Sequence, residues 1–146
     1  MHTFTSPARQ IRRFAPLLLI VLTLLSGCAS TSKQSNALVE AQHAWSGAVR
    51  WNDFRTAWQM VDPDYREAHP MSDLEFSRYE QLQVTGYRPE EGAGSADGTT
   101  RSIRSGVVNR HTMTERTVRY TEQWHWDETA QHWWNTSGLP DLSSSP

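Results

Sequence analysis

Residues 117–127 read TVRYTEQWHWD, and this stretch decides the fold. Apolar or aromatic residues occupy every second position except at Glu122, and the intervening positions are polar. Side chains alternate between the two faces of a strand, so this period predicts a strand with one aromatic face and one hydrated face. The aromatic face is expected to carry Val118, Tyr120, Glu122, Trp124 and Trp126.

Strands are predicted on both sides of this stretch. Asp127–Gln131 is expected to form a hairpin loop, after which His132–Thr136 returns as a short strand. Upstream, Arg101–Met113 and Ser77–Tyr87 are rich in strand-forming residues. The segment between them, Arg88–Thr100, holds three glycines and a proline, and we expect a flexible loop there. The sequence therefore predicts a sheet of three to four antiparallel strands.

The segment before the predicted strands has the period of a helix. Asn36 can cap a helix, and the apolar residues after it recur at spacings of three and four, which places them on one helical face. They form either one long helix or two helices joined near Gly47–Asn52. Pro63 must break or restart the helix, because proline lacks a backbone donor and restricts the residue before it. A further helical turn is expected at Tyr65–His69. The residues on the apolar face, whose tryptophans are expected to pack in the core, are Leu38, Ala41, Trp45, Ala48, Trp51, Phe54, Trp58 and Val61.

The N-terminal residues have the pattern of a targeting segment. Arg9, Arg12 and Arg13 precede an apolar stretch, Ala15–Leu25, which is interrupted only by Thr23. A helix of these 11 residues spans about 16 Å, roughly half of the thickness of the hydrocarbon core of a bilayer. A secretory signal is therefore favoured over a membrane-spanning helix, and the segment is left out of the fold.

The apolar stretch ends in Leu25-Ser26-Gly27-Cys28, which resembles the lipobox of bacterial lipoproteins. The resemblance implies that Cys28 carries acyl chains, palmitate among them, and becomes the first mature residue. Cys28 is the only cysteine, so no intramolecular disulfide and no cysteine-based metal site can form. The resemblance also implies a bacterial source and export to the periplasm. Ala29 then suggests attachment to the outer membrane of a Gram-negative cell.

The sequence predicts four parts. Residues 1–27 are the lipoprotein signal peptide, 28–35 the lipidated cysteine and a polar tether, 36–142 a single α+β domain, and 143–146 a disordered tail. The N-terminal helices are expected to pack on one face of a curved antiparallel sheet. In its element order, its Trp- and Ala-rich helix and its closing Trp-rich hairpin, the domain resembles the nuclear transport factor 2-like superfamily, a cone-shaped fold. A cystatin-like arrangement, also a helix packed in a curved sheet, shares this order and remains the alternative.

Three residues on the inward strand face, Tyr120, Glu122 and Trp124, are the candidate pocket residues. A carboxylate there is costly unless it is paired or hydrogen-bonded, and we expect an arginine partner, Arg78 or Arg110. The family resemblance implies instead that the inward face lines a pocket, in which an acid can act as a general base. One tyrosine and one glutamate two residues apart do not reproduce a base with a separate oxyanion hole. No catalytic residue is therefore assigned.

Other chemistry is not indicated. Of the six histidines, the four considered as metal ligands are spread singly along the chain: His69, His111, His125 and His132. His125 and His132 can face each other across the predicted hairpin, but polar cross-strand pairing explains that arrangement. Motifs of hydrolases, phosphate loops and dinucleotide sites are missing, so we expect no metal and no cofactor. The formal net charge of −2 argues against nucleic-acid binding. Arginines gather between residues 101 and 119, where they would suit an anionic envelope component or prevent edge pairing of strands.

The lipobox resemblance thus implies a lipid-anchored protein on the periplasmic side of the outer membrane. Its expected role is to bind a partner or an envelope component, without catalysis. The alternative is a small-molecule-binding protein or an enzyme that uses a pocket between the helices and the sheet. A Glu122 buried against an arginine would favour the first role, and an open cleft beside Glu122 would favour the second.

Overall fold

The computed structural model describes residues 31–95 and 97–143, which form helices followed by an antiparallel sheet. Residues 31–50 are helical and are named the long helix below. Three short helices follow: α2 (Phe54–Gln59), α3 (Pro63–Ala68) and α4 (Asp73–Glu80). The strands are β1 (Leu82–Gly94), β2 (Gly98–Asn109), β3 (Glu115–Asp127) and β4 (His132–Asn135). The α+β class expected from the sequence is confirmed.

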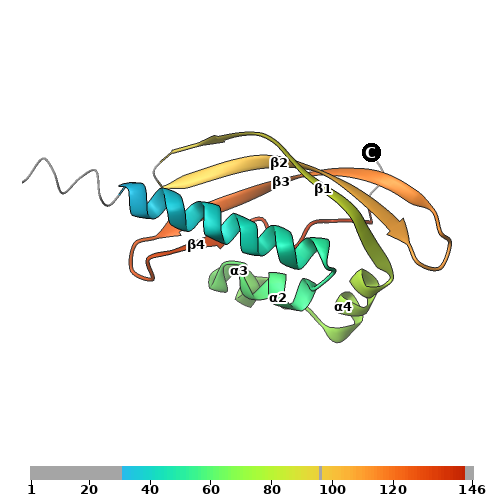
Figure 1. Ribbon diagram of the computed structural model, residues 1–146. Coiled ribbons are helices and arrows are strands. Elements are labelled where there is room, and N and C mark those ends of the chain that lie inside the picture. The colour runs from blue at the N-terminus through green and yellow to red at the C-terminus, as the bar shows by residue number, and fades with distance from the viewer. Residues whose placement is uncertain (1–30, 96, 144–146) are drawn as a thin grey trace, which may run out of the picture. The chain divides into compact units, whose positions relative to one another are not determined.

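The four strands form one sheet in the order β1-β2-β3-β4, with every neighbouring pair antiparallel. Figure 1 shows the sheet as curved, with the helices on one of its faces. No helix within the described ranges is both long enough and apolar enough to cross a bilayer.

The long helix ends at a tight turn after residue 50, which confirms the predicted alternative of two helices joined near Gly47–Asn52. Asn52 has a positive φ of 62°, which asparagine tolerates better than most residues, and Asp53 caps α2 by accepting from the Thr56 backbone N–H at 3.0 Å. The Asn52 side chain donates to the Leu82 carbonyl at 2.6 Å and ties this turn to β1. The turn leaves Trp51 86% exposed, so its predicted core position is wrong.

The other helix boundaries follow from capping residues. Residues 31–35 are already helical, so the helix start predicted at Asn36 is wrong. Pro63 is the first residue of α3 after the cap Asp62, which confirms the predicted break. Ser72 and Glu75 form a capping box at the start of α4. Because that helix runs to Glu80, the strand predicted from Ser77 begins only at Leu82.

The glycine-rich segment predicted as a flexible loop, Arg88–Thr100, is mostly strand. It forms the end of β1 and the beginning of β2, and only residues 95–97 separate the two strands. Gly92 permits this pairing because a Cβ there would lie 2.4 Å from the Thr100 carbonyl oxygen. The glycines therefore allow close strand approach instead of flexibility.

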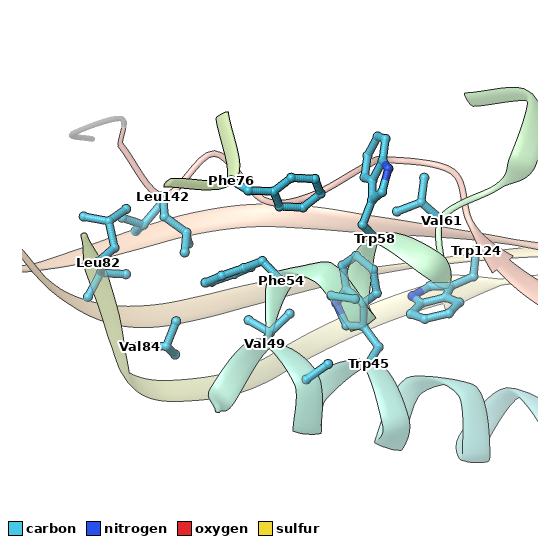
Figure 2. Packing of buried hydrophobic residues seen from close by; sticks show 14 of the residues in the cluster. Trp45, Val49, Phe54, Trp58, Val61, Phe76, Leu82, Val84, Trp124 and Leu142 are labelled. Carbon is cyan, nitrogen blue, oxygen red and sulfur yellow. The ribbon is translucent and has the colours of Figure 1, made fainter. Parts of the chain in front are cut away.

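The core lies between the helices and the inward face of the sheet. The ring of Trp45 packs edge-on against Trp124 of β3, with ring centroids 5.8 Å apart and an interplanar angle of 83°. In Figure 2, Trp45 and Val49 point from the long helix toward α2 and the sheet. The aromatic face predicted for residues 117–127 is confirmed, because Val118, Glu122, Trp124 and Trp126 are all buried.

Candidate functional site

A buried carboxylate lies at the centre of the inward sheet face. Glu122 is 1% exposed and pairs in register with Arg101 of β2. Its Oε1 accepts from Trp45 Nε1 at 2.8 Å and from the Tyr87 hydroxyl at 2.6 Å. Its Oε2 accepts from Arg101 Nε at 2.7 Å and, more weakly, from Trp124 Nε1 at 3.4 Å. These five residues, with Gln42, are called the Glu122 cluster below.

The guanidinium of Arg101 is held on several sides. Its Nη2 donates to the Tyr87 hydroxyl at 2.6 Å and to the Gln42 carbonyl oxygen at 3.4 Å, and its Nη1 donates to Gln42 Oε1 at 3.2 Å. The Arg101 side chain is 13% exposed, against 1% for Glu122. The ion pair is therefore almost fully removed from water. Each charge is stabilised by the opposite charge and by its hydrogen bonds to neighbouring side chains.

A β-bulge brings Tyr87 into the cluster. In a regular strand, Tyr87 would point away from the face that carries Leu82 and Val84. The register of β1 against β2 shifts by one residue between Val84 and Gly86. This extra residue reverses the alternation, as bulges do, so Tyr87 lies opposite the buried Ser105 and reaches Glu122. A sequence-based prediction that assumes a regular strand misses this contact.

The structure corrects the predicted partner of Glu122. An arginine does pair with it, but that arginine is Arg101, neither Arg78 nor Arg110. Arg78 is an exposed residue of α4, and Arg110 is exposed in the turn after β2. The alternation of the buried Ile103 and Val107 places Arg101 on the inward face, and this signal was available in the sequence.

The three candidate pocket residues lie together on the inward face of the sheet. Tyr120, Glu122 and Trp124 share the inward face of β3, and Tyr120 Oη is buried with no hydrogen-bond partner among the described residues. Both oxygens of Glu122 are occupied by donors, so the carboxylate has little capacity left to take a proton from a substrate. The geometry therefore favours a structural role for Glu122.

A groove opens at one end of the sheet, away from the Glu122 cluster. It has a volume of about 490 Å³ and lies between α4, the beginnings of β1 and β3, the end of β2 and the segment around Leu142. Arg116, Tyr79 and Asp141 contribute polar groups, whereas Met71 and Leu142 contribute apolar surface. None of the three candidate pocket residues lines this groove.

Histidines and acids do not gather into a metal site in the part of the chain that the structure describes. His125 pairs in register with Trp134, and His132 pairs with Asp127. The two histidines therefore do not face each other directly across the hairpin, which corrects the arrangement considered from the sequence. The ring of His132 lies against Trp134 on its own strand, with centroids 4.4 Å apart.

Alkaline pH is expected to unfold the domain as its buried tyrosines ionise. Burial raises the pKa of Tyr79 to about 12, and burial followed by the charge of Glu122 raises the pKa of Tyr87 and Tyr120 further. Unfolded tyrosines ionise near pH 10.0, so the stabilisation is complete below that pH and is lost as the pH rises through the folded-state pKa values. Phenolate absorbance and circular dichroism should therefore change together above pH 10.0. Three phenols that ionise near their ordinary pKa in an intact fold would contradict the burial.

The predicted signal peptide (residues 1–27), Cys28 and Ala29 lie outside the described residues, as do the last three residues of the predicted tail. The structure therefore bears on the folded part alone.

Comparison with known proteins gives a likeness of fold. No protein-family model matches the chain, and no curated protein is found to be similar to it in sequence. Among solved structures, it is similar to a SEC-C motif containing protein from Rhodopseudomonas palustris, determined in solution. The match has a TM-score of 0.52 and 15% sequence identity, and it covers 64% of this chain and 70% of the other. At this identity the likeness extends to the fold alone.

Proposed function

We propose that the protein is a lipid-anchored domain of the bacterial envelope that binds a partner or an envelope component without catalysis. The observation that carries the proposal is the N-terminal pattern of arginines, an apolar stretch and Leu25-Ser26-Gly27-Cys28. A thioether-linked lipid on Cys28, with further acyl chains, would give lasting membrane attachment, because each buried methylene contributes about 0.8 kcal/mol. Ala29 supports the outer membrane as the site of attachment.

The interior of the domain supports a role without catalysis. Glu122, the acidic residue on the inward face of β3, is engaged by donors from Trp45, Tyr87 and Arg101. A general base needs a free lone pair within reach of the substrate proton. Binding would then take place on the outside of the domain, on its grooves and exposed faces.

The finer fold assignment is also a proposal. Three short helices, α2 to α4, accompany the long helix on the curved sheet. This set of helices supports a nuclear transport factor 2-like arrangement over a cystatin-like one, in which a single helix packs in the sheet. The groove of about 490 Å³ beside α4 has the size of a small-molecule site and keeps ligand binding as the second candidate function.

Replacing the acylated residue tests the anchor. The Cys28→Ser chain is expected to lose palmitate labelling in bacterial cells and to accumulate as uncleaved or soluble precursor, whereas the wild-type chain should label and fractionate with the outer membrane. Lys33→Ala, a change close to Cys28 that leaves Leu25-Ser26-Gly27-Cys28 intact, serves as the control and should label normally. Continued labelling and outer-membrane fractionation of the Cys28→Ser chain would refute the anchor.

Crosslinking from intact cells then tests the role of the anchored domain. We expect one dominant envelope partner that is lost from the Cys28→Ser chain. Recovery of no partner by the wild-type chain would shift the weight to the groove beside α4 and to small-molecule binding.

A further inference from the structure

A second groove lies between the long helix and the sheet, directly outside the Glu122 cluster. It has a volume of about 280 Å³. The long helix contributes Gln42, His43, Ser46 and Arg50, and the sheet contributes Tyr87 and Arg101. Among the described residues, the rest of the lining, Val39 and Pro89, is apolar and contains no carboxylate. It is named the helix–sheet groove below.

The back wall of the helix–sheet groove is a fixed cation. Arg101 has five N–H donors, and the bonds to Glu122, Tyr87 and Gln42 occupy four of them. One N–H on Nη1 is left for another acceptor. Because these bonds hold the guanidinium in place, a ligand would not have to order it on binding.

Two further donors are available beside Arg101. The Gln42 side-chain oxygen accepts from Arg101, and no acceptor for its NH₂ group is found among the described residues. Arg50 is the last residue of the long helix, is exposed, and forms no ion pair with a described carboxylate. The positive charge of Arg101 is balanced by Glu122, whereas that of Arg50 has no such balance.

We propose that the helix–sheet groove binds a small anion, a carboxylate or a phosphate group, between Arg50 and the outer edge of Arg101. Guanidinium groups bind both anions through paired charge-assisted hydrogen bonds, and the small volume suits a compact ligand. Gln42 and His43 supply further donors at the same opening. The proposal goes beyond a role in envelope binding and does not depend on the lipid anchor.

Calorimetric titration of the full chain in a neutral detergent tests this site, with inorganic phosphate and acetate as separate probes. We expect saturable binding of at least one probe, with a dissociation constant on the order of 1 mM. The probe that binds with the lower dissociation constant identifies the anion class. Saturation by neither probe would overturn the proposal.

Substitutions locate the binding on the molecule. Arg50→Gln is expected to weaken binding about tenfold or more, the effect of losing one charge-assisted hydrogen bond. Arg110→Gln removes another exposed arginine outside the groove and should leave the affinity unchanged. Gln42→Glu places a negative charge at the opening and should abolish binding, with circular dichroism showing that the fold is kept. Equal affinities in the wild-type and Arg50→Gln chains would overturn the proposal.

Discussion

Replacement of Glu122 by glutamine is expected to lower the free energy of unfolding by about 3–5 kcal/mol. The change keeps the size of the side chain but leaves the guanidinium of Arg101 buried without its counter-charge. It also puts an NH₂ donor where one carboxylate oxygen accepts hydrogen bonds, so Arg101 Nε or the Tyr87 hydroxyl would lose its acceptor. Denaturant unfolding followed by circular dichroism measures the loss.

Glu67→Gln is the matched control for this prediction. Glu67 is exposed in α3, so the same chemical change there should stay within about 0.5 kcal/mol of the wild type. A Glu122→Gln chain as stable as this control would show that the carboxylate has access to water. In that case the open-pocket function would regain its site.

Truncation of Trp45 to alanine is expected to cost about 3–5 kcal/mol, because it leaves a large cavity in the core. Trp45 is 0% exposed, packs against Trp124, and donates to Glu122. Trp45→Phe should recover much of the loss, since it restores most of the apolar volume and leaves only the hydrogen bond to Glu122 unmade. Thermal and denaturant unfolding of both variants measure the two losses in the free energy of unfolding.

Trp51 offers a control of the same residue type just after the long helix. It is 86% exposed, so Trp51→Ala should change the free energy of unfolding by about 0.5 kcal/mol or less. Equal losses from Trp45→Ala and Trp51→Ala would contradict the described end of the helix and the core that depends on it.

The clearest local patterns in the sequence, regular spacing of apolar residues and a helix-breaking proline, were sufficient to predict much of the fold. The alternation of residues 117–127 identified β3 and its buried face, and Pro63 marked a real break between helices. These predictions hold because each depends on one periodic pattern or on one residue with restricted backbone geometry.

The errors arise where tertiary contacts override local pattern. Trp51 continues the apolar rhythm of the helix, but the turn at Asn52 is pinned to Leu82 of β1, which lies far away in the sequence. The segment around Gly92 has loop-like composition, yet the pairing of β1 with β2 uses its small size. Such contacts are fixed by the sheet register, which local composition does not encode.

The candidate site was predicted in outline and missed in detail. The need of Glu122 for an arginine follows from the cost of a buried charge, and that prediction is confirmed. The identity of that arginine depends on the register between β2 and β3, and the role of Tyr87 depends on a bulge. The alternation of residues along β1 does not indicate where this bulge lies.

A double-mutant cycle between Glu122 and Arg101 tests most directly whether the two residues form a buried structural ion pair. The free energies of unfolding of Glu122→Gln, Arg101→Met and the double variant are compared with that of the wild type. Each single change leaves one buried charge alone, whereas the double change removes both, so we predict that the double variant loses at least about 2 kcal/mol less than the two single losses together. Losses that add to within about 0.5 kcal/mol would show that the two groups act independently and would contradict a structural ion pair at the centre of the domain.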